Sequence, residues 1–324
     1  MPAGPMLFGG LVLLGLAPAT ALRRRDEPVA AAALEGGGTF GADADSSTKF
    51  IFVTHHKTGT NLAQRLCNIS ALTLSDGAEQ CHWCLKLMRL NDNGTITCPT
   101  DFASQHGTFR GSVGRFTMFS SLSARDLRRL RKWAPDYRIV HMTRDPVSMI
   151  VSDYQYNKRL YESGKFLWDM TVNKTAFGSS SSLEDALRNI SYSLSHFVND
   201  MCSLTEATKD DPHVLTMDLK DFQGEAFEPS TRQLFSFMHG AEHAKMAEMV
   251  EGASMWNSAK YPNLRTFHVF FSGNNKTPAI ETKVQEMFKA GDPMVTAAAS
   301  CAGAAAAVPW ASKVSHTGSA RRMA

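Results

Sequence analysis

Two short segments carry residues whose types and spacing are suited to binding an anion. Residues 50–61 read FIFVTHHKTGTN, so an apolar run is followed by a lysine, Lys57, and a single glycine, Gly59. Further along, the run RIVHMT leads to Arg144, and Ser152 follows eight residues later. Ammonium, guanidinium and hydroxyl groups all donate hydrogen bonds to phosphate or sulfate oxygens. The two segments therefore indicate phosphate or sulfate chemistry.

The first segment has the pattern of a strand that runs through a tight loop into a helix. A glycine lets the backbone pass close to a ligand, and the unpaired N–H groups at a helix start attract an anion. The segment is not a Walker A loop, because that motif places its lysine after the second of two glycines, whereas Lys57 precedes Gly59. An ordinary strand-to-helix turn with a glycine remains the alternative.

The second segment has the same local plan. Arg144 ends a strand-like run, and Pro146 suits the first turn of a helix. Ser152 would then lie two turns into that helix, where it and Arg144 could bind one oxyanion. A surface arginine and a serine that simply faces its own helix would produce the same pattern.

The elements that must position these residues alternate along the chain. Short β-branched and aromatic runs predict strands, and apolar residues at helical spacing predict helices. The predicted strands are 49–54, 116–119, 138–143 and 213–217, and the predicted helices are 60–72, 124–133, 146–156, 182–205, 230–238 and 242–250. This alternation predicts an α/β fold with a parallel sheet flanked by helices. Residues 74–112 show no clear period and are predicted to be an irregular insertion.

The composition sets limits on the function. Hydrophobic residues make up 43% of the 324 and charged residues 20%, which is enough to bury a core and excludes a disordered chain. The net charge of +3 does not suit a protein that coats a polyanion, so no nucleic-acid partner is predicted. We divide the chain into a signal peptide or signal anchor (1–22), a linker (23–48), a single catalytic domain (49–292) and a low-complexity, disordered tail (293–324).

Cysteines and glycosylation sequons indicate the secretory pathway. The chain has six cysteines, and an even count in an oxidising compartment favours disulfides. Cys81 and Cys84 form a CxxC pair for which a metal or redox role remains an alternative. Asn-x-Ser/Thr sequons begin at residues 68, 93, 173, 189 and 275. Contact with a membrane is predicted only through an uncleaved N-terminal anchor.

Taken together, the two segments resemble the sulfotransferases that use 3′-phosphoadenosine 5′-phosphosulfate (PAPS), and the resemblance extends over roughly residues 49–280. Residues 56–61, HKTGTN, are similar to the family's P-K-x-G-T-[TS] loop. Residues 144–152 are similar to its R-x-P-x-x-x-x-x-S motif, and Tyr154 follows. His56 departs from the family's proline, and Asn61 stands where threonine or serine is common. The resemblance implies a P-loop-type parallel sheet and a secretory, carbohydrate-directed enzyme.

The resemblance also implies roles for individual residues. Lys57 would contact the sulfuryl group and the bridging oxygen, and Arg144 and Ser152 would hold the 3′-phosphate. The 5′-phosphate would lie on the backbone N–H groups of Thr58, Gly59, Thr60 and Asn61. A late loop containing Ser272 and Gly273 is a candidate for further contacts. PAPS is the implied co-substrate, and no metal is implied.

A base must take the proton of the acceptor hydroxyl. Cytosolic family members place a histidine where this chain has Ser120, and glycan-modifying members often use a glutamate about 22 residues beyond the lysine, which here is Glu79. Glu79 and His106 are the predicted catalytic candidates beside Lys57. His55 and His56 remain alternatives.

The secretory location implies a glycan or glycoconjugate acceptor in the Golgi lumen. Two other functions remain open: a P-loop kinase that acts on a small molecule, and a secreted glycoprotein that keeps the fold without catalysis. The kinase would need a Walker A loop and a Mg²⁺-binding carboxylate.

Overall fold

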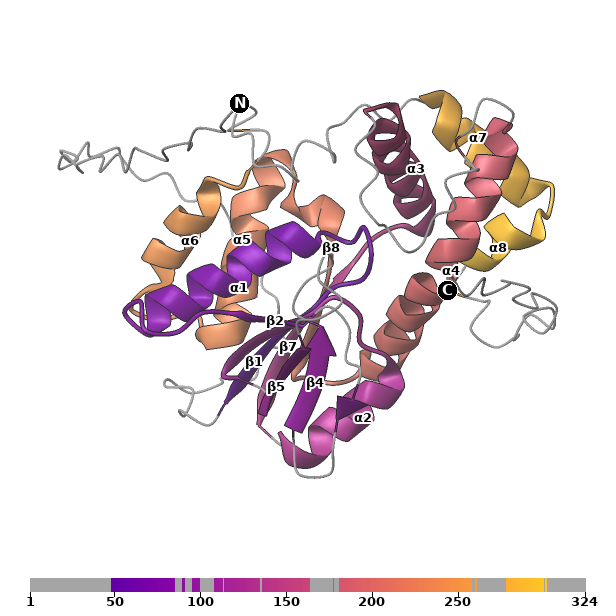
Figure 1. Ribbon diagram of the computed structural model, residues 1–324. Coiled ribbons are helices and arrows are strands. Elements are labelled where there is room, and N and C mark those ends of the chain that lie inside the picture. The colour runs from indigo at the N-terminus through magenta and orange to yellow at the C-terminus, as the bar shows by residue number, and fades with distance from the viewer. Residues whose placement is uncertain are drawn as a thin grey trace, which may run out of the picture. The chain divides into compact units, whose positions relative to one another are not determined.

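A parallel sheet forms the centre of the described part of the chain (Figure 1). The computed structural model describes residues 48–84, 89–90, 95–99, 108–112, 114–134, 136–163, 177, 181–257, 260, 278–299 and 301. Five strands pair in the order β2-β6-β1-β7-β8, and every pairing is parallel. They span Lys49–Val53 (β1), His82–Cys84 (β2), Phe116–Phe119 (β6), Tyr137–Thr143 (β7) and Val214–Asp218 (β8). The predicted α/β fold with a parallel sheet is confirmed.

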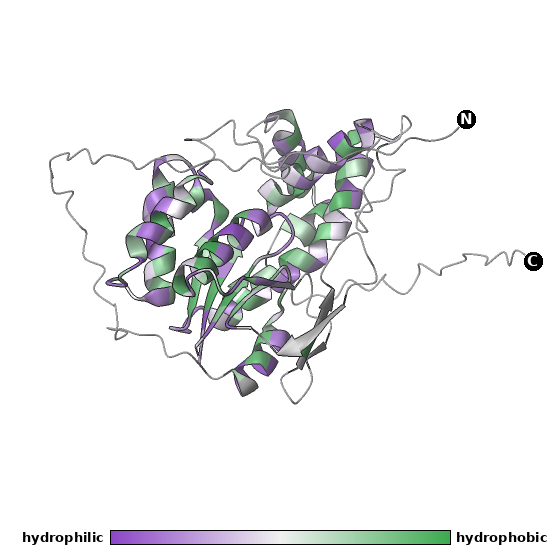
Figure 2. Ribbon diagram, turned by 60° about the vertical axis from the view of Figure 1, so that its left-hand side comes forward, coloured by the Kyte–Doolittle hydropathy of each residue, from purple (hydrophilic) through white to green (hydrophobic). Residues whose placement is uncertain are grey.

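Helices cover both faces of this sheet, because side chains alternate along each strand. On one face, Phe50 and Phe52 of β1 pack in a core with α1 (Thr60–Leu74), α5 (Phe227–His239) and α6 (Met246–Ser254). On the other, Ile51 and Val53 pack with α2 (Ala124–Trp133) and with Leu204 near the end of α4 (Leu183–Thr208). Figure 2 shows the strands as a hydrophobic layer between these helices. A capping box between Ser123 and Asp126 begins α2.

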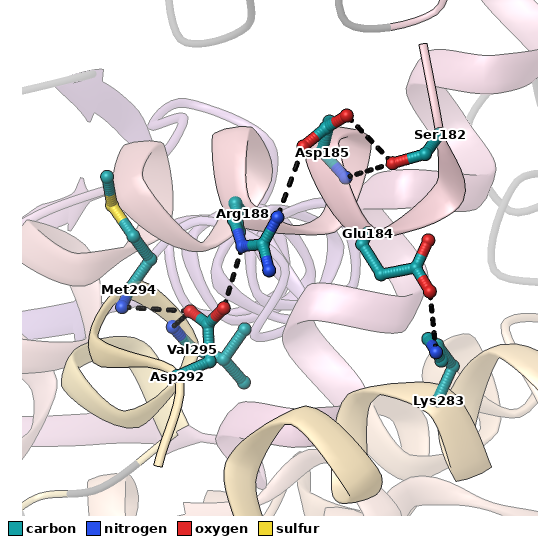
Figure 3. Close-up of polar contacts among 8 residues, drawn as sticks. All are labelled: Ser182, Glu184, Asp185, Arg188, Lys283, Asp292, Met294 and Val295. Carbon is teal, nitrogen blue, oxygen red and sulfur yellow. Dashed lines mark hydrogen bonds and ion pairs between the residues drawn. The ribbon is translucent and has the colours of Figure 1, made fainter. Parts of the chain in front are cut away.

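A second core lies among four helices, which we call the helical cluster. It consists of α3 (Pro146–Glu162), α4, α7 (Pro278–Lys289) and α8 (Pro293–Ala299). Ion pairs join α4 to α7 and to the residue before α8 (Figure 3): Lys283 lies 2.6 Å from Glu184, and Arg188 lies 2.7 Å from Asp292. A disulfide between Cys202 and Cys301 links α4 to the residues after α8.

Two predictions about structure are wrong. The interval 74–112 contains β2 of the main sheet and a three-stranded antiparallel sheet of β3 (Arg89–Leu90), β4 (Thr95–Pro99) and β5 (Thr108–Ser112). β2 and β3 have only three and two residues, and β4 (TITCP) and β5 (TFRGS) have few apolar residues, so none of them shows a clear hydrophobic period. The tail predicted to be disordered from residue 293 begins with α8, because an alanine-rich segment forms a good helix and buries Val295 and Ala298 in the helical cluster. Residues 1–47 and 302–324 lie outside the described residues.

The disulfides agree with an oxidising compartment. Cys81 is bonded to Cys67 of α1, so the CxxC pair is not bonded to itself, and Cys84 is buried on β2. Disulfides persist in secreted and lumenal proteins. Among the described helices, none combines the length and hydropathy of a membrane span.

Candidate functional site

The sheet has a topological switch point between β1 and β7. From β1 the chain continues to β2 and β6 on one side, and it then crosses to β7 on the other side of β1. In open parallel sheets, ligands bind outside the carboxyl ends of the strands at such a point. The two segments singled out from the sequence leave the sheet here, because Lys57 follows β1 and Arg144 follows β7.

The loop after β1 is closed by its own hydrogen bonds. The backbone N–H of His55 donates to Oγ1 of Thr58 at 2.7 Å, and this hydroxyl donates to the carbonyl of His55 at 3.0 Å. Gly59 caps α1 with φ at 96° and with no side-chain hydrogen bond to the helix start. A Cβ at Gly59 would lie 2.7 Å from Cδ1 of Leu219, a side-chain atom that can shift, so it is the positive φ that favours glycine here. The first turn of α1 is therefore uncapped by a side chain, as an anion site requires.

Lys57 lies in this loop in a conformation that is rare for a residue with a side chain. Its φ is 67°, and such conformations occur preferentially at functional sites. The ammonium lies 3.2 Å from Oδ1 of Asp153 and 3.7 Å from the centre of the Tyr156 ring. An ammonium group has three donors, so one contact with a carboxylate leaves capacity to bind an anion.

Arg144 reaches across from the end of β7 to this loop. Its Nη1 donates to the backbone carbonyl of Lys57 at 3.0 Å. Burial lowers its pKa, while Asp145 and Asp218 raise it, and a guanidinium stays protonated in either case. Ser152 is buried on α3. The structure therefore brings Lys57 and Arg144 together at neighbouring strand ends.

Asp153 is the residue at this site that the sequence analysis missed. It is fully buried on α3, and its Oδ1 accepts from Lys57 at 3.2 Å and from His56 Nε2 at 3.0 Å. Burial raises the pKa of Asp153, but the charges of Lys57 and then His56 lower it by more than burial raises it, so that the pKa falls to about 2. Nδ2 of Asn157 donates to the same oxygen at 3.1 Å. The available signal was a lone acidic residue beside the apolar positions Met149–Val151.

A histidine pair lies beneath the loop. Nε2 of His55 and Nε2 of His141 are 3.0 Å apart, and both residues are completely buried. Burial lowers the pKa of both, to about 3 for His141. The pair is therefore neutral near pH 7, and one ring donates to the other. It supports the strand ends from inside and has no exposed surface that could reach a substrate.

Several predicted residues lie away from this site or outside the described residues. Glu79 follows the far end of α1, a helix of 15 residues and about 22 Å, and its backbone N–H donates to Ser75. That placement does not support the predicted role of Glu79 as the base. His106, Ser272 and Gly273 are outside the described residues. Ser120 is buried and accepts from Nε1 of Trp83.

Comparison with known proteins gives a limited result. No family model matches the chain, and no curated protein matches it. Among solved structures, a mouse sulfotransferase, SULT7A1, complexed with PAP is similar at 14% identity, over 79% of this chain and 88% of that one, with a TM-score of 0.37. A retinol dehydratase in complex with androsterone and inactive cofactor PAP is similar at 13% identity, over 76% and 79%, with a TM-score of 0.43. A sulfotransferase, STF9, from Mycobacterium avium is similar at 14% identity, over 55% and 42%, with a TM-score of 0.30.

Proposed function

We propose that this chain is a sulfotransferase that transfers a sulfuryl group from PAPS to a hydroxyl of a glycan or glycoconjugate. One observation carries the proposal. Nη1 of Arg144 donates to the backbone carbonyl of Lys57 at 3.0 Å, and the two residues follow neighbouring parallel strands at the switch point of the sheet. Two residues with cationic side chains and an uncapped helix start thus lie where an open sheet binds its ligand.

The donor groups suit a nucleotide that carries two phosphate groups. The backbone N–H groups of residues 58–61 would hold one phosphate at the start of α1. Arg144 and Ser152 would hold the other, because a guanidinium and a hydroxyl both donate to phosphate oxygens. PAPS, when bound, supplies the transferable sulfuryl group. Lys57 would offset the charge that develops on the oxygens around the sulfur, as cations do in phosphoryl transfer.

A hydroxyl acceptor on a glycan fits the compartment. The two disulfides support an oxidising, secreted or lumenal environment, and glycan acceptors occur in such an environment. The Golgi lumen and the glycan are proposals that rest on this compartment and on the sequons in the sequence.

The test uses the purified chain, ³⁵S-labelled PAPS and a panel of unsulfated glycans. We expect transfer that Lys57→Ala reduces about 10²- to 10³-fold, the loss typical when a group that stabilises developing charge is removed. Lys283→Ala in the helical cluster is the matched control and should transfer normally. Binding of PAP, which is PAPS without its sulfuryl group, in the absence of any transfer would instead support a non-catalytic glycoprotein. Preferential use of ATP would support a kinase.

A further inference from the structure

His56 lies within the site between a buried carboxylate and an aromatic ring. Its Nε2 is 3.0 Å from Oδ1 of Asp153, and its ring stacks on Phe197 of α4 with centroids 5.3 Å apart. The His56 side chain keeps 20% of its surface exposed. A histidine that is oriented by a carboxylate and still reaches solvent has the arrangement of a general base.

The contact with Asp153 determines which ring nitrogen carries the proton. Asp153 is ionised near neutral pH, because its pKa lies at about 2. A carboxylate only accepts hydrogen bonds, so Nε2 of His56 must be the N–H donor. In the neutral ring, Nδ1 is then the basic nitrogen, and it has no hydrogen-bond partner among the residues that the structure describes.

Lys57 and His56 share one oxygen of Asp153. The Nζ–Oδ1 and Nε2–Oδ1 distances are 3.2 and 3.0 Å, so the two nitrogens are at most about 6 Å apart. The basic Nδ1 lies beyond Nε2 in the same ring, and a base and a cation held by one carboxylate can act on the two sides of one transferred group. The charged groups that face His56 are Asp153 on α3 and Lys57 in the loop, and from α4 His196 lies beside the stacked Phe197.

We propose that His56 is the general base of the reaction, with Asp153 as the residue that positions it; this rests on the proposed sulfotransferase function. The acceptor oxygen forms a bond to sulfur while the bond from sulfur to the 5′-phosphate oxygen breaks, and that oxygen keeps the electron pair. Nδ1 of His56 takes the proton of the acceptor hydroxyl. Asp153 then stabilises the imidazolium through Nε2, as a buried carboxylate does for a catalytic histidine.

Neighbouring histidines do not compete for this role. His55 and His141 are fully buried, and their Nε2 atoms are hydrogen-bonded to each other. Their Nδ1 atoms are enclosed without a hydrogen-bond partner in the described residues, and burial keeps both rings neutral by lowering their pKa. His56 is thus the histidine of this loop that combines a fixed ring with exposed surface.

The experiment compares the full chain with His56→Gln and Asp153→Asn. Glutamine at position 56 can still donate to Asp153 but has no basic nitrogen. We expect His56→Gln to bind PAP within about threefold of the wild type and to transfer ³⁵S to the glycan panel about 10²- to 10⁴-fold more slowly. The decline in rate at acidic pH should disappear in this variant, and imidazole in the buffer should restore part of the rate. His82→Gln, at an exposed position of β2, is the matched control.

A second readout does not depend on activity. In ¹⁵N-histidine NMR spectra, His56, assigned by its loss in His56→Gln, should appear as the Nε2–H form. Asp153→Asn should weaken the preference for this form and shift the pH profile of transfer. If Asp153 had only a structural role, the ring form of His56 and the pH profile would both stay unchanged.

The possible outcomes separate the two proposals. If the wild type does not bind PAP, the sulfotransferase function fails and the base assignment fails with it. If PAP binding and transfer are present but His56→Gln keeps the wild-type rate and pH profile, only the base assignment fails. An Nδ1–H form of His56 in the wild type would also overturn it.

Discussion

The site at the switch point and the helical cluster differ in how deeply their charged groups are buried. At the site, a completely buried carboxylate, Asp153, holds two cationic or protonatable side chains. In the helical cluster, the ion pairs lie outside an apolar core: Arg188 and Lys283 keep 45% and 31% of their side-chain surface exposed. Charges in water contribute little to stability, whereas a buried charge must keep its partner. The stability of the site therefore depends on each of its charges, whereas the stability of the helical cluster depends on its apolar core and its disulfide.

The largest expected effect on stability is at Asp153. Asp153→Ala leaves Lys57 and His56 without their shared partner, and removing one member of a buried pair costs about 3–5 kcal/mol. Urea unfolding at pH 7 measures the change. A loss below about 1 kcal/mol would mean that water replaces the carboxylate and that its ion pairs contribute no more to stability than exposed surface pairs do.

A somewhat smaller effect is expected from the disulfide of the helical cluster. Cys202 and Cys301 are separated by 99 residues, and removing a disulfide typically costs about 2–4 kcal/mol. Cys301→Ser should lower the free energy of unfolding by about this amount and leave the affinity for PAP unchanged, as calorimetry can show. A parallel loss of PAP binding would contradict the independence of the two regions.

Acid should weaken the sheet through its buried histidines. Burial lowers the pKa of His239, which packs on Phe50 and Phe116, to about 3, against an ordinary value of 6.5. The unfolded chain therefore binds a proton that the folded chain does not, and stability falls as the pH drops from 6.5 towards 3. The slope is at most about 1.4 kcal/mol per pH unit for one such group.

His239→Gln tests this pH dependence by removing one titrating ring. Urea unfolding of the variant at several pH values between 6.5 and 4 should show a shallower decline than that of the wild type. Identical slopes for the two proteins would show that His239 does not titrate between its folded and unfolded states.

The smallest effect is expected at Lys283. Its contact with Glu184 is short, at 2.6 Å, but each side chain keeps about a third of its surface exposed. Lys283→Ala should leave the urea midpoint within experimental error, because solvent screens the pair and the side chain regains its freedom. A clear loss of stability would show that α7 depends on this ion pair to stay on α4.

Much of the fold could be predicted from the sequence, because buried strands have recognisable patterns. Phe50–Val53 is an apolar run, Ile139–Met142 is apolar apart from His141, and the loops that follow them carry the predicted cations. The antiparallel strands β3–β5 could not be predicted, since β3 has two residues and β4 and β5 have few apolar residues, and the helix α8 reads as low-complexity sequence.

The site was only partly predictable for a related reason. Lys57 and Arg144 stand at strand ends, which a local pattern reveals. Asp153 and His56 meet only in three dimensions, since 97 residues separate them. The sequence around a helical aspartate does not show whether its carboxylate points inward or to water, so the contact with Lys57 had to come from the structure.

The central claim is that two neighbouring strand ends hold the two phosphates of one nucleotide. Calorimetry with PAP and adenosine 5′-phosphate, on the wild type, Arg144→Ala and the control Arg188→Ala, tests it most directly. We predict that the wild type and the control prefer PAP by about 10- to 100-fold, the value of a charged hydrogen-bonding contact, and that Arg144→Ala loses this preference. Equal binding of both nucleotides by the wild type, or an equal loss for both in Arg144→Ala, would contradict the account.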